Sequence, residues 1–415
     1  MRIKPHTGAP PHIAVVGAGA FGGWTALHLL ERGAQVTLLD AWGPGNSRAS
    51  SGGETRVMRG TYGPDQPYAE MAARALKLWA KYERKWKRQF LHRCGVLWMA
   101  SGHDDTFERG SIEALRAAKI PFQELSASQM RKRWPQINFE GIEWGIFETE
   151  CGYLDARASC AAVVGAFVNA GGEYKQAAVV SAHVVTASSA VRLSKSGVND
   201  LENGRLRSLC LSDGSELKAD GYVFACGPWL GRLFPKAVGN LVRATKQDVF
   251  FFGAPAGDTR FHDPNTPVWG DHRYHFYYGI PGSDRRGFKI ADDTRGPDFD
   301  PTSGERVIDP ATLKNVREYI AFRFPALKDA PLIETRVCQY EQTPDSHFII
   351  DRHPENGNVW LVGGGSGHGF KHGPAVGELM SELILKDREP AAVWRLDRFK
   401  KGSPQGTQGF TAKSL

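Results

Sequence analysis

Residues 13–40 read IAVVGAGAFGGWTALHLLERGAQVTLLD, and this stretch decides the fold. It opens with a short apolar run rich in β-branched residues, as expected of a buried parallel strand. A helical pattern follows and ends at Gly33, and a second apolar strand over residues 35–39 ends in Asp40. Between the first strand and the helix lie the three glycines of a GxGxxG turn: Gly17, Gly19 and Gly22.

This strand–turn–helix–strand unit predicts a dinucleotide site. The glycines allow backbone N–H groups to approach a pyrophosphate at a helix N-terminus, where the helix dipole favours negative charge. Asp40 lies 21 residues beyond Gly19, in position to accept hydrogen bonds from ribose hydroxyls. The alternative is a plain glycine-rich turn with Asp40 as a surface cap. The motif by itself does not distinguish NAD from FAD.

Two later stretches return to the same kind of unit. Residues 220–234, DGYVFACGPWLGRLF, place a strand before a turn of small residues. Residues 358–385, NVWLVGGGSGHGFKHGPAVGELMSELIL, place a strand before a glycine-rich turn and a helix. Gly364 and Gly367 in this turn are candidate cofactor contacts, and the helix N-terminus could face negative charge on a flavin ring. Three such units spread over the chain favour FAD.

The composition is that of an ordinary soluble globular protein. The chain has 415 residues, 41% of them hydrophobic and 23% charged, which is long enough for two domains. The net charge of +7 raises the question of nucleic acid, but no recognised module accompanies it. The densest basic run, residues 81–90, lies on an expected helix with a regular buried stripe: Met71, Ala75, Trp79, Tyr82, Trp86 and Phe90.

The six cysteines show neither zinc-site nor disulfide-scaffold spacing, so we expect a reduced cytoplasmic protein without a structural metal. We expect neither a secretion signal nor a membrane span, and we find no internal repeat in the sequence.

The pattern predicts an α/β fold in which a Rossmann-like FAD-binding domain is joined to an α+β substrate domain built on an antiparallel sheet. The FAD-binding domain is expected to be discontinuous, over residues 1–90, 151–240 and 336–395. The substrate domain is expected over residues 91–150 and 241–335. A tail of residues 396–415 completes the chain.

Four blocks of sequence carry a resemblance to a known family: GAGAFG (17–22), GGETRVMRGTYG (52–63), CQYEQTPDSHFIIDRHP (338–354) and SGHGFK (366–371). The segment YYGIPGSDRRGFKIADD (277–293) lies between them in the matching order. The chain resembles the monomeric sarcosine oxidase and N-methyltryptophan oxidase family, FAD-dependent amine oxidases of the D-amino-acid-oxidase superfamily.

The resemblance implies that Cys338 holds FAD covalently, through a bond from its sulfur to the flavin 8α carbon. A thiolate is a strong nucleophile, so the chemistry is reasonable. The alternative is a small buried core residue, a common role of cysteines that form no disulfide.

In the resembled family, the position of Arg56 lies near the flavin and that of Arg59 binds the substrate carboxylate. Arg59 suits this role because its planar fork can bind a carboxylate through two hydrogen bonds. Lys371 matches the second carboxylate contact, and Tyr340 is assigned to the substrate site. The residues alone leave open that the two arginines are surface charges of a helix and that Lys371 faces solvent.

His368 matches the family's active-site histidine, where it either tunes the flavin environment or holds the turn by a hydrogen bond. Lys289 matches the lysine at which reduced flavin meets oxygen. A fixed ammonium there would stabilise the negative charge that develops on oxygen. The alternative for Lys289 is a surface position on a strand.

Two departures from the family pattern concern the substrate. Asp293, preceded by Asp292, replaces a family histidine, and Glu341 replaces a smaller polar residue. If both carboxylates line the pocket, they would favour a substrate with a second amino group, another cation or a polyhydroxylated chain. They would also raise the pKa of a bound amine. Sarcosine is therefore a doubtful substrate, and fructosyl amino acids remain open.

The resemblance implies oxidation of a C–N bond in a secondary or primary amino acid to an imine, with O2 reduced to H2O2, by a monomer. One alternative is a flavin dehydrogenase that passes electrons to a quinone or carrier protein. Another is a non-catalytic protein with structural FAD.

Overall fold

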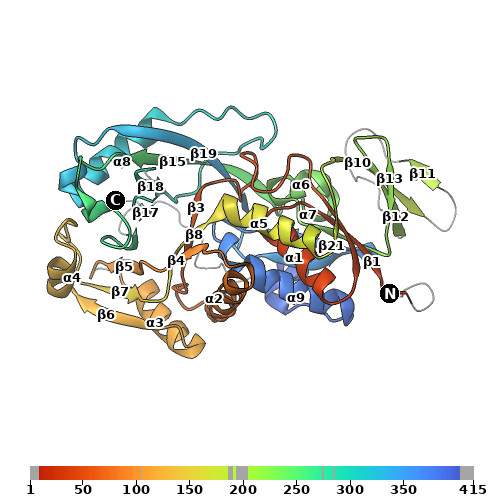
Figure 1. Ribbon diagram of the computed structural model, residues 1–415, viewed down its shortest axis with the longest axis horizontal. Helices are drawn as coiled ribbons and strands as arrows, with labels where there is room; N and C mark the ends of the chain where they lie inside the picture. Colours follow the sequence, from red (N-terminus) through yellow and green to blue (C-terminus); the bar gives the residue numbers. More distant parts are fainter. Residues whose placement is uncertain are drawn as a thin grey trace.

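The computed structural model describes residues 9–102, 104–185, 190–192, 204–272, 275–283 and 286–401. The molecule is elongated, with a mainly parallel sheet and its helices toward one end and a larger mixed sheet toward the other (Figure 1). The expected α/β architecture is therefore present.

The first sheet has six strands in the order β20–β21–β14–β1–β2–β9. β1 pairs in parallel with both β2 and β14, and β14 pairs in parallel with β21, so the three strand–turn–helix units meet in one sheet as predicted. The strands are β1 (His12–Val16), β2 (Gln35–Leu39), β9 (Glu173–Lys175), β14 (Gly221–Phe224), β20 (Ile349–His353) and β21 (Asn356–Gly363).

Helices that are apolar around most of their surface cover this sheet. α1 (Ala20–Glu31) is buried over its first ten residues and contacts both α5 (Ala156–Asn169) and α9 (Gly373–Leu385). A helix without a solvent-facing side has an apolar sequence around its whole circumference, and the sequence of α1 shows this pattern. α9 in turn contacts α2 (Gln66–Trp86), which faces solvent on its other side.

The second sheet has eight strands in the order β19–β15–β18–β17–β16–β5–β7–β6. Its pairs are antiparallel except β16 with β5. The aromatic stretches near residues 250 and 277 therefore form antiparallel strands, as predicted. The strands are β5 (Val96–Ala100), β6 (Phe122–Ser126), β7 (Trp144–Glu148), β15 (Arg243–Phe252), β16 (Val268–Asp271), β17 (Tyr277–Ile280), β18 (Phe288–Asp292) and β19 (Leu332–Gln342).

Two small sheets complete the strands. One contains β3 (Thr55–Met58), β8 (Gly152–Asp155) and β4 (Leu91–His92); the other contains β10 (Val179–Val185), β11 (Ala190–Arg192), β12 (Arg205–Leu211) and β13 (Glu216–Lys218). The expected hairpin turn in LSDGSE joins β12 to β13. The part of the expected hairpins over residues 193–203 and the tail from residue 402 lie outside the described residues.

The remaining helices are short or lie on the second sheet: α3 (Thr106–Ala118), α4 (Ala127–Arg133), α6 (Leu230–Leu233), α7 (Pro235–Val238), α8 (Pro310–Arg323) and α10 (Arg398–Lys401). Single 3₁₀ turns lie at Gly227–Trp229 (η1), Thr259–Phe261 (η2), Pro325–Leu327 (η3), Phe370–His372 (η4) and Ala392–Trp394 (η5).

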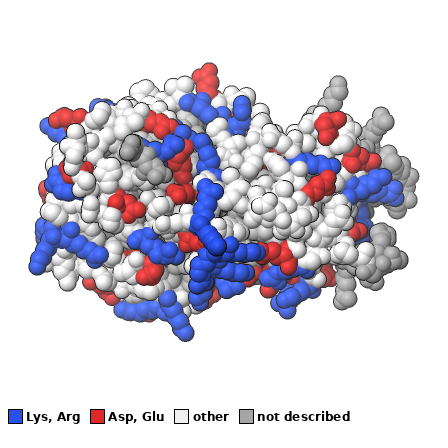
Figure 2. Space-filling view, in the orientation of Figure 1, with Lys and Arg blue, Asp and Glu red and all other residues white. Residues whose placement is uncertain are grey.

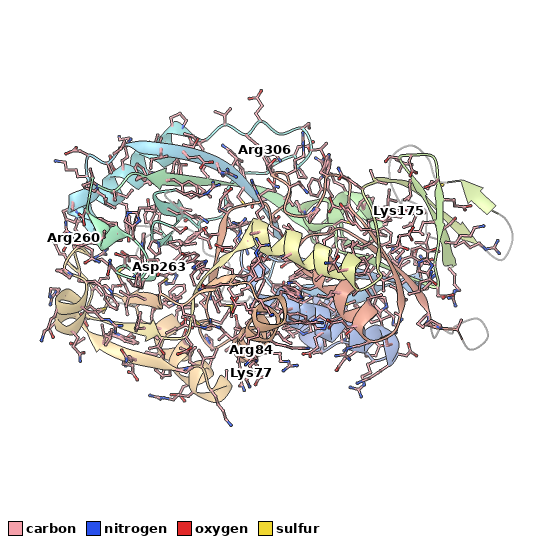
Figure 3. All side chains as sticks on the ribbon, in the orientation of Figure 1. Lys77, Arg84, Lys175, Arg260, Asp263 and Arg306 are labelled. Atoms are coloured by element: carbon pink, nitrogen blue, oxygen red, sulfur yellow. The ribbon has the colours of Figure 1, made fainter. Side chains whose placement is uncertain are left out.

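The basic run near residue 85 forms the exposed face of α2. Figure 2 shows Lys and Arg gathered in a band over this helix, and Lys77 and Arg84 are labelled on it in Figure 3. Tyr82 and other residues of the opposite face are buried, as the periodicity predicts. The expectation that Phe90 belongs to the stripe on this helix is wrong. The helix ends at Trp86, and Phe90 lies beyond it, buried before β4.

The strands of the six-stranded sheet come from the segments assigned above to the FAD-binding domain, whereas β19 crosses the expected boundary at residue 335. The division into two domains stays a prediction. Within the described part of the chain, no helix combines the length and apolar character needed to cross a membrane.

Candidate active site

Between β1 and the first turn of α1, two positions have room for glycine only. Gly17 has φ +106°, and a Cβ there would lie 2.3 Å from the carbonyl oxygen of Ala225 on the neighbouring strand. A Cβ on Gly22 would lie 1.8 Å from the carbonyl oxygen of Gly17. The first turn of the helix is therefore pressed against the strand, which leaves its N-terminal backbone accessible to a phosphate.

Asp40, which directly follows β2, holds this turn through hydrogen bonds. Its Oδ2 accepts a hydrogen bond of 2.8 Å from the backbone N–H of Ala18, and its Oδ1 accepts bonds from Trp42 (2.9 Å) and Gly43 (2.8 Å). Burial raises the pKa of Asp40, although these hydrogen bonds act in the opposite direction. The carboxylate is thus fixed at the carboxyl edge of the sheet, where a ribose would lie in such a unit.

A cavity with about 1260 Å³ of empty space opens beside the turn. All three units contribute to its lining: Gly17, Gly19 and Asp40 from the first, Trp229 from the second and Gly367 from the third. Gly22 and Gly364 are not among its lining residues and serve close packing instead.

The chemistry of this larger cavity fits a dinucleotide. The backbone turn at Gly17 and Gly19 is open to it, and Asp40 supplies acceptors. The buried hydroxyl of Ser50 on its wall has no hydrogen-bond partner in the described structure. A buried hydroxyl without a partner is costly, so a polar ligand at this wall would stabilise it.

Cys338 lies in β19, half-buried beside the larger cavity. Its sulfur is 3.3 Å from Nη2 of Arg56 and 3.9 Å from the carbonyl oxygen of Ser50, and both neighbours line the cavity. Cys338 packs against the apolar cluster that contains Phe251, but it also contacts a guanidinium and a carbonyl, so apolar side chains do not enclose it. This environment does not match a cysteine that only fills the core.

A second cavity, with about 570 Å³ of empty space, adjoins the first. Arg56, Tyr340, Gly367 and Phe370 line both cavities, so the two share a wall. The aromatic residues of the second cavity come from the eight-stranded sheet, from the position just before its strand β17, and from the turn before α9: Trp98, Trp269, Tyr278, Tyr340, Phe276 and Phe370.

Besides Arg56 on the shared wall, two further cations reach this second cavity. Arg59 follows β3 and is buried, with its guanidinium carbon 4.3 Å from the ring centre of Tyr62 and 5.1 Å from that of Trp98. Lys371 is also buried, and its Nζ donates to Tyr62 OH and to the carbonyl of His368, each at 2.7 Å. Neither residue is a charge on the surface of a helix, so those alternatives are wrong.

The surroundings of Lys371 destabilise its charged form. Burial and the nearby Arg59 lower its pKa well below the ordinary value for lysine. The hydrogen bonds of its ammonium go to a phenol and a carbonyl, neither of them an anion, whereas a bound carboxylate would stabilise both cations at once.

His368 makes two hydrogen-bond contacts that hold the glycine-rich turn. Its Nε2 lies 3.0 Å from the carbonyl oxygen of Ser346, and its Nδ1 lies 3.3 Å from Tyr62 OH. Burial and Lys371 lower its pKa well below the ordinary value, so the neutral ring is favoured. His368 also lines the second cavity. Its contacts place it at the turn, and a role in tuning the flavin environment stays a prediction.

Lys289 is buried in β18 and is not a surface lysine. Its Nζ donates to the carbonyl of Thr55 at 3.0 Å, next to Arg56. Burial and the charge of Arg56 lower the pKa of Lys289 to about 7.

The two unusual carboxylates are separated in the structure. Asp293 lines the second cavity, where its Oδ1 accepts a 2.5 Å hydrogen bond from Tyr340 OH. Glu341 lines only the larger cavity and accepts from the backbone N–H of Gly364 at 3.2 Å. The expectation that both line one pocket is wrong for Glu341, because its carboxylate is turned toward the backbone of the glycine-rich turn at Gly364.

The family model described as DAO, FAD dependent oxidoreductase, matches residues 12–383. The chain belongs to this family. The predicted fold class and the predicted relationship are thereby confirmed, together with an FAD-dependent enzyme.

Known relatives of this FAD-dependent oxidoreductase cover nearly the same length. The chain is 28% identical in sequence to monomeric sarcosine oxidase of Bacillus sp. (strain B-0618), over 93% of this chain and 95% of the relative. It is 24% identical to N-methyl-L-tryptophan oxidase of Yersinia pestis (strain Pestoides F), over 91% and 95%. The crystal structure of L-proline dehydrogenase from P. horikoshii superimposes with a TM-score of 0.80 at 21% identity, over 95% and 99%.

Tyr62 is a site residue of the oxidoreductase that the sequence did not reveal. Its hydroxyl lies 2.7 Å from both Lys371 Nζ and His372 Nε2, and its ring lies under the guanidinium of Arg59. It is fully buried and thus fixes both cations relative to each other. Tyr62 lies three residues after Arg59 in the block GGETRVMRGTYG, and this position could have indicated that it belongs to the site.

Glu148 was missed as well. It is fully buried at the end of β7 and accepts hydrogen bonds from Gly60 N (2.6 Å), Thr61 N (3.1 Å), Thr61 Oγ1 (2.6 Å) and Cys151 Sγ (3.1 Å). These bonds tie the segment after Arg59 to the second sheet. Nothing in the local sequence around Glu148 indicates this role.

Proposed function

We propose that this oxidoreductase oxidises the C–N bond of a secondary or primary amino acid to an imine and reduces O2 to H2O2. The observation that carries the proposal is the aromatic cavity in which Arg59 and Lys371 converge, beside a cavity built for a dinucleotide. The names of the two relatives, a sarcosine oxidase and an N-methyl-L-tryptophan oxidase, support N-alkyl amino acids as the class.

In this proposal the substrate carboxylate binds to Arg59 and Lys371. The planar guanidinium offers two parallel donors, and the ammonium of Lys371 adds a third. The carboxylate also offsets the repulsion between the two buried cations, which supports an anionic ligand over a neutral one. The aromatic walls exclude water and surround the apolar part of the substrate.

FAD, when bound, supplies the acceptor for the two electrons and the hydrogen that leave the carbon next to nitrogen. Gly17, Gly19 and Asp40 would hold its dinucleotide part, Gly22 would keep the helix packed against the turn, and Gly364 and Gly367 would shape the turn near its ring. We propose Cys338 as a covalent attachment point, which is supported by its contacts with Arg56 and Ser50 on the cavity wall.

The other polar residues have supporting roles in the proposal. Arg56 carries positive charge on the wall shared by the two cavities, and His368 holds the glycine-rich turn. Lys289 supplies an ammonium that stabilises negative charge on oxygen during its reduction. Tyr340 holds Asp293 at the substrate cavity.

We further propose a reduced cytoplasmic monomer that binds neither nucleic acid nor membrane, with the two-domain division given above. The six cysteines include no disulfide within the described residues, in keeping with this environment.

The decisive experiment mixes the purified protein anaerobically with N-methyl, cyclic and glycated amino acids and follows the flavin absorbance. Loss of the oxidised flavin spectrum, followed by stoichiometric peroxide after oxygen is admitted, is the expected result. The methyl esters of the same substrates are matched controls and should react poorly, because they lack the carboxylate. If no amino acid reduces the flavin, the proposal is wrong; reduction without peroxide would identify a dehydrogenase instead.

A further inference from the structure

Asp293 presents one oxygen to the second cavity. It directly follows β18, and its backbone N–H donates to the carbonyl of Phe276 at 2.7 Å. Its Oδ1 is occupied by the 2.5 Å hydrogen bond from Tyr340, whereas Oδ2 makes no hydrogen bond to any described residue. A carboxylate held in this way has a fixed orientation and one oxygen free to accept a proton.

The charged and titratable groups that face Asp293 come from every neighbouring element. Tyr340 of β19 donates to it, and the phenol of Tyr278 on β17 lies near it. Arg59 and Lys371 contribute positive charge, and Asp292 contributes negative charge. Asp292 itself is held by the ring of His275, whose Nδ1 lies 2.8 Å from its Oδ2.

Asp293 is the single carboxylate among the described residues that line this cavity, which also contains Arg59 and Lys371. The cavity therefore combines three cationic side chains, because Arg56 lies on the wall shared with the larger cavity, with one potential anion. An α-amino acid in neutral water has the complementary arrangement, a carboxylate and an ammonium attached to the same carbon. When the carboxylate binds to Arg59 and Lys371, Asp293 is the acidic group available to the ammonium.

An ammonium nitrogen has no lone pair, so the amine must lose a proton before the neighbouring carbon can be oxidised. A base serves this purpose best when its pKa lies near the working pH. Burial raises the pKa of Asp293 to about 7, against the opposing effects of Tyr340 and Arg59.

We propose that Asp293 is the base that removes the proton from the ammonium group of the bound substrate. The N–H bond breaks, its electron pair stays on nitrogen, and an O–H bond forms at Oδ2. No electron leaves the substrate in this step, and the products are a neutral amine and a protonated carboxyl. The inference rests on the proposed function and adds a catalytic residue to it.

The test uses Asp293→Asn, which keeps an oxygen for Tyr340 and removes the base. Anaerobic flavin reduction is measured with one N-methyl amino acid from about pH 6 to about pH 10. We expect wild-type reduction to rise through about pH 7 as Asp293 ionises. The variant should be about 10²-fold slower at neutral pH and should recover as the pH approaches the pKa of the amine, because the substrate then arrives neutral.

Two further variants and one ligand test whether the asparagine substitution damages the structure. Asp292→Asn, whose side chain does not line the cavity, should keep a rate that rises with pH, with the rise at slightly lower pH because the charge of Asp292 raises the pKa of Asp293. Asp293→Glu retains a carboxylate and should keep a rise near neutral pH even if the asparagine variant does not fold. Propionate, which has a carboxylate but no amine, should bind equally to wild type and Asp293→Asn when followed by flavin absorbance.

The proposal is overturned if Asp293→Asn keeps the wild-type rate at neutral pH. It is also overturned if the loss is equal at every pH, because Asp293 would then be a positioning residue only. A wild-type protein that no amino acid reduces at any pH overturns the proposed function itself and the role of Asp293 with it.

Discussion

The Nη2 atom of Arg56 lies 3.3 Å from the sulfur of Cys338, although the two residues are 282 positions apart in the chain. The contact joins β3 to β19, two strands of different sheets, at the edge of the larger cavity. It holds the sulfur next to a fixed positive charge and orients it beside the wall formed by Ser50.

Replacement of Cys338 by alanine should release the flavin from the protein. We expect yellow colour in the acid-precipitated pellet of wild type and in the supernatant of Cys338→Ala. Absorbance of the two fractions near the flavin maximum is the measurement. Cys210→Ala is the matched control, because Cys210 is also half-buried but lies in β12. A wild-type supernatant that carries the colour would rule out the thioether.

Lys371→Met should weaken substrate binding. A hydrogen bond to a charged group contributes about 1.5–3 kcal/mol, which corresponds to an increase in KM of about 10- to 150-fold. kcat should change less, because the carboxylate is bound in the ground state and the transition state alike. Steady-state kinetics with an amino acid and its methyl ester checks this. Lys77→Met, on the exposed face of α2 (Figure 3), should leave KM unchanged. An equal effect on acid and ester would contradict carboxylate binding.

Lys289→Met should slow reoxidation of the reduced flavin by about 10²-fold and leave anaerobic reduction nearly unchanged. The pKa of Lys289 is lowered to about 7, so its charged fraction grows as the pH falls through this value. The wild-type reaction with oxygen should therefore accelerate toward lower pH, and the variant should lose this dependence. Stopped-flow mixing of reduced protein with oxygen measures both. An unchanged rate of reoxidation would remove Lys289 from the mechanism.

Glu148→Gln should destabilise the protein and raise KM. The amide has one acceptor oxygen where the carboxylate has two, so a buried N–H of Gly60 or Thr61 loses its partner. We expect a decrease in the free energy of unfolding of about 1–3 kcal/mol. Denaturant unfolding measures it, with the exposed Glu150→Gln as the control. If stability falls but KM does not rise, Glu148 supports the fold without positioning Arg59.

The parts of the fold that were predictable depend on local sequence. The turn at Gly17 follows from its neighbours, because only glycine tolerates both the positive φ and the close carbonyl of Ala225. The aromatic strand β15 also follows from its own residues. By contrast, the end of α2 before Phe90 depends on the αL residue Lys87, which the apolar repeat does not indicate.

The parts of the site that escaped prediction depend on distant partners. Tyr62 and Lys371 are 309 positions apart, and Gly60 and Glu148 are 88 apart. The resemblance supplied Arg59 and Lys371 but gave no reason why they are close to each other.

The order of strands in the first sheet has a consequence for synthesis of the protein. β1 leaves the ribosome first, but the wall that completes its cavity includes β21 and the turn around Gly367. A nascent chain therefore cannot enclose a cofactor until almost all of it has been translated. Until then β14 has an unpaired edge, and chains released prematurely should be prone to aggregation and free of flavin.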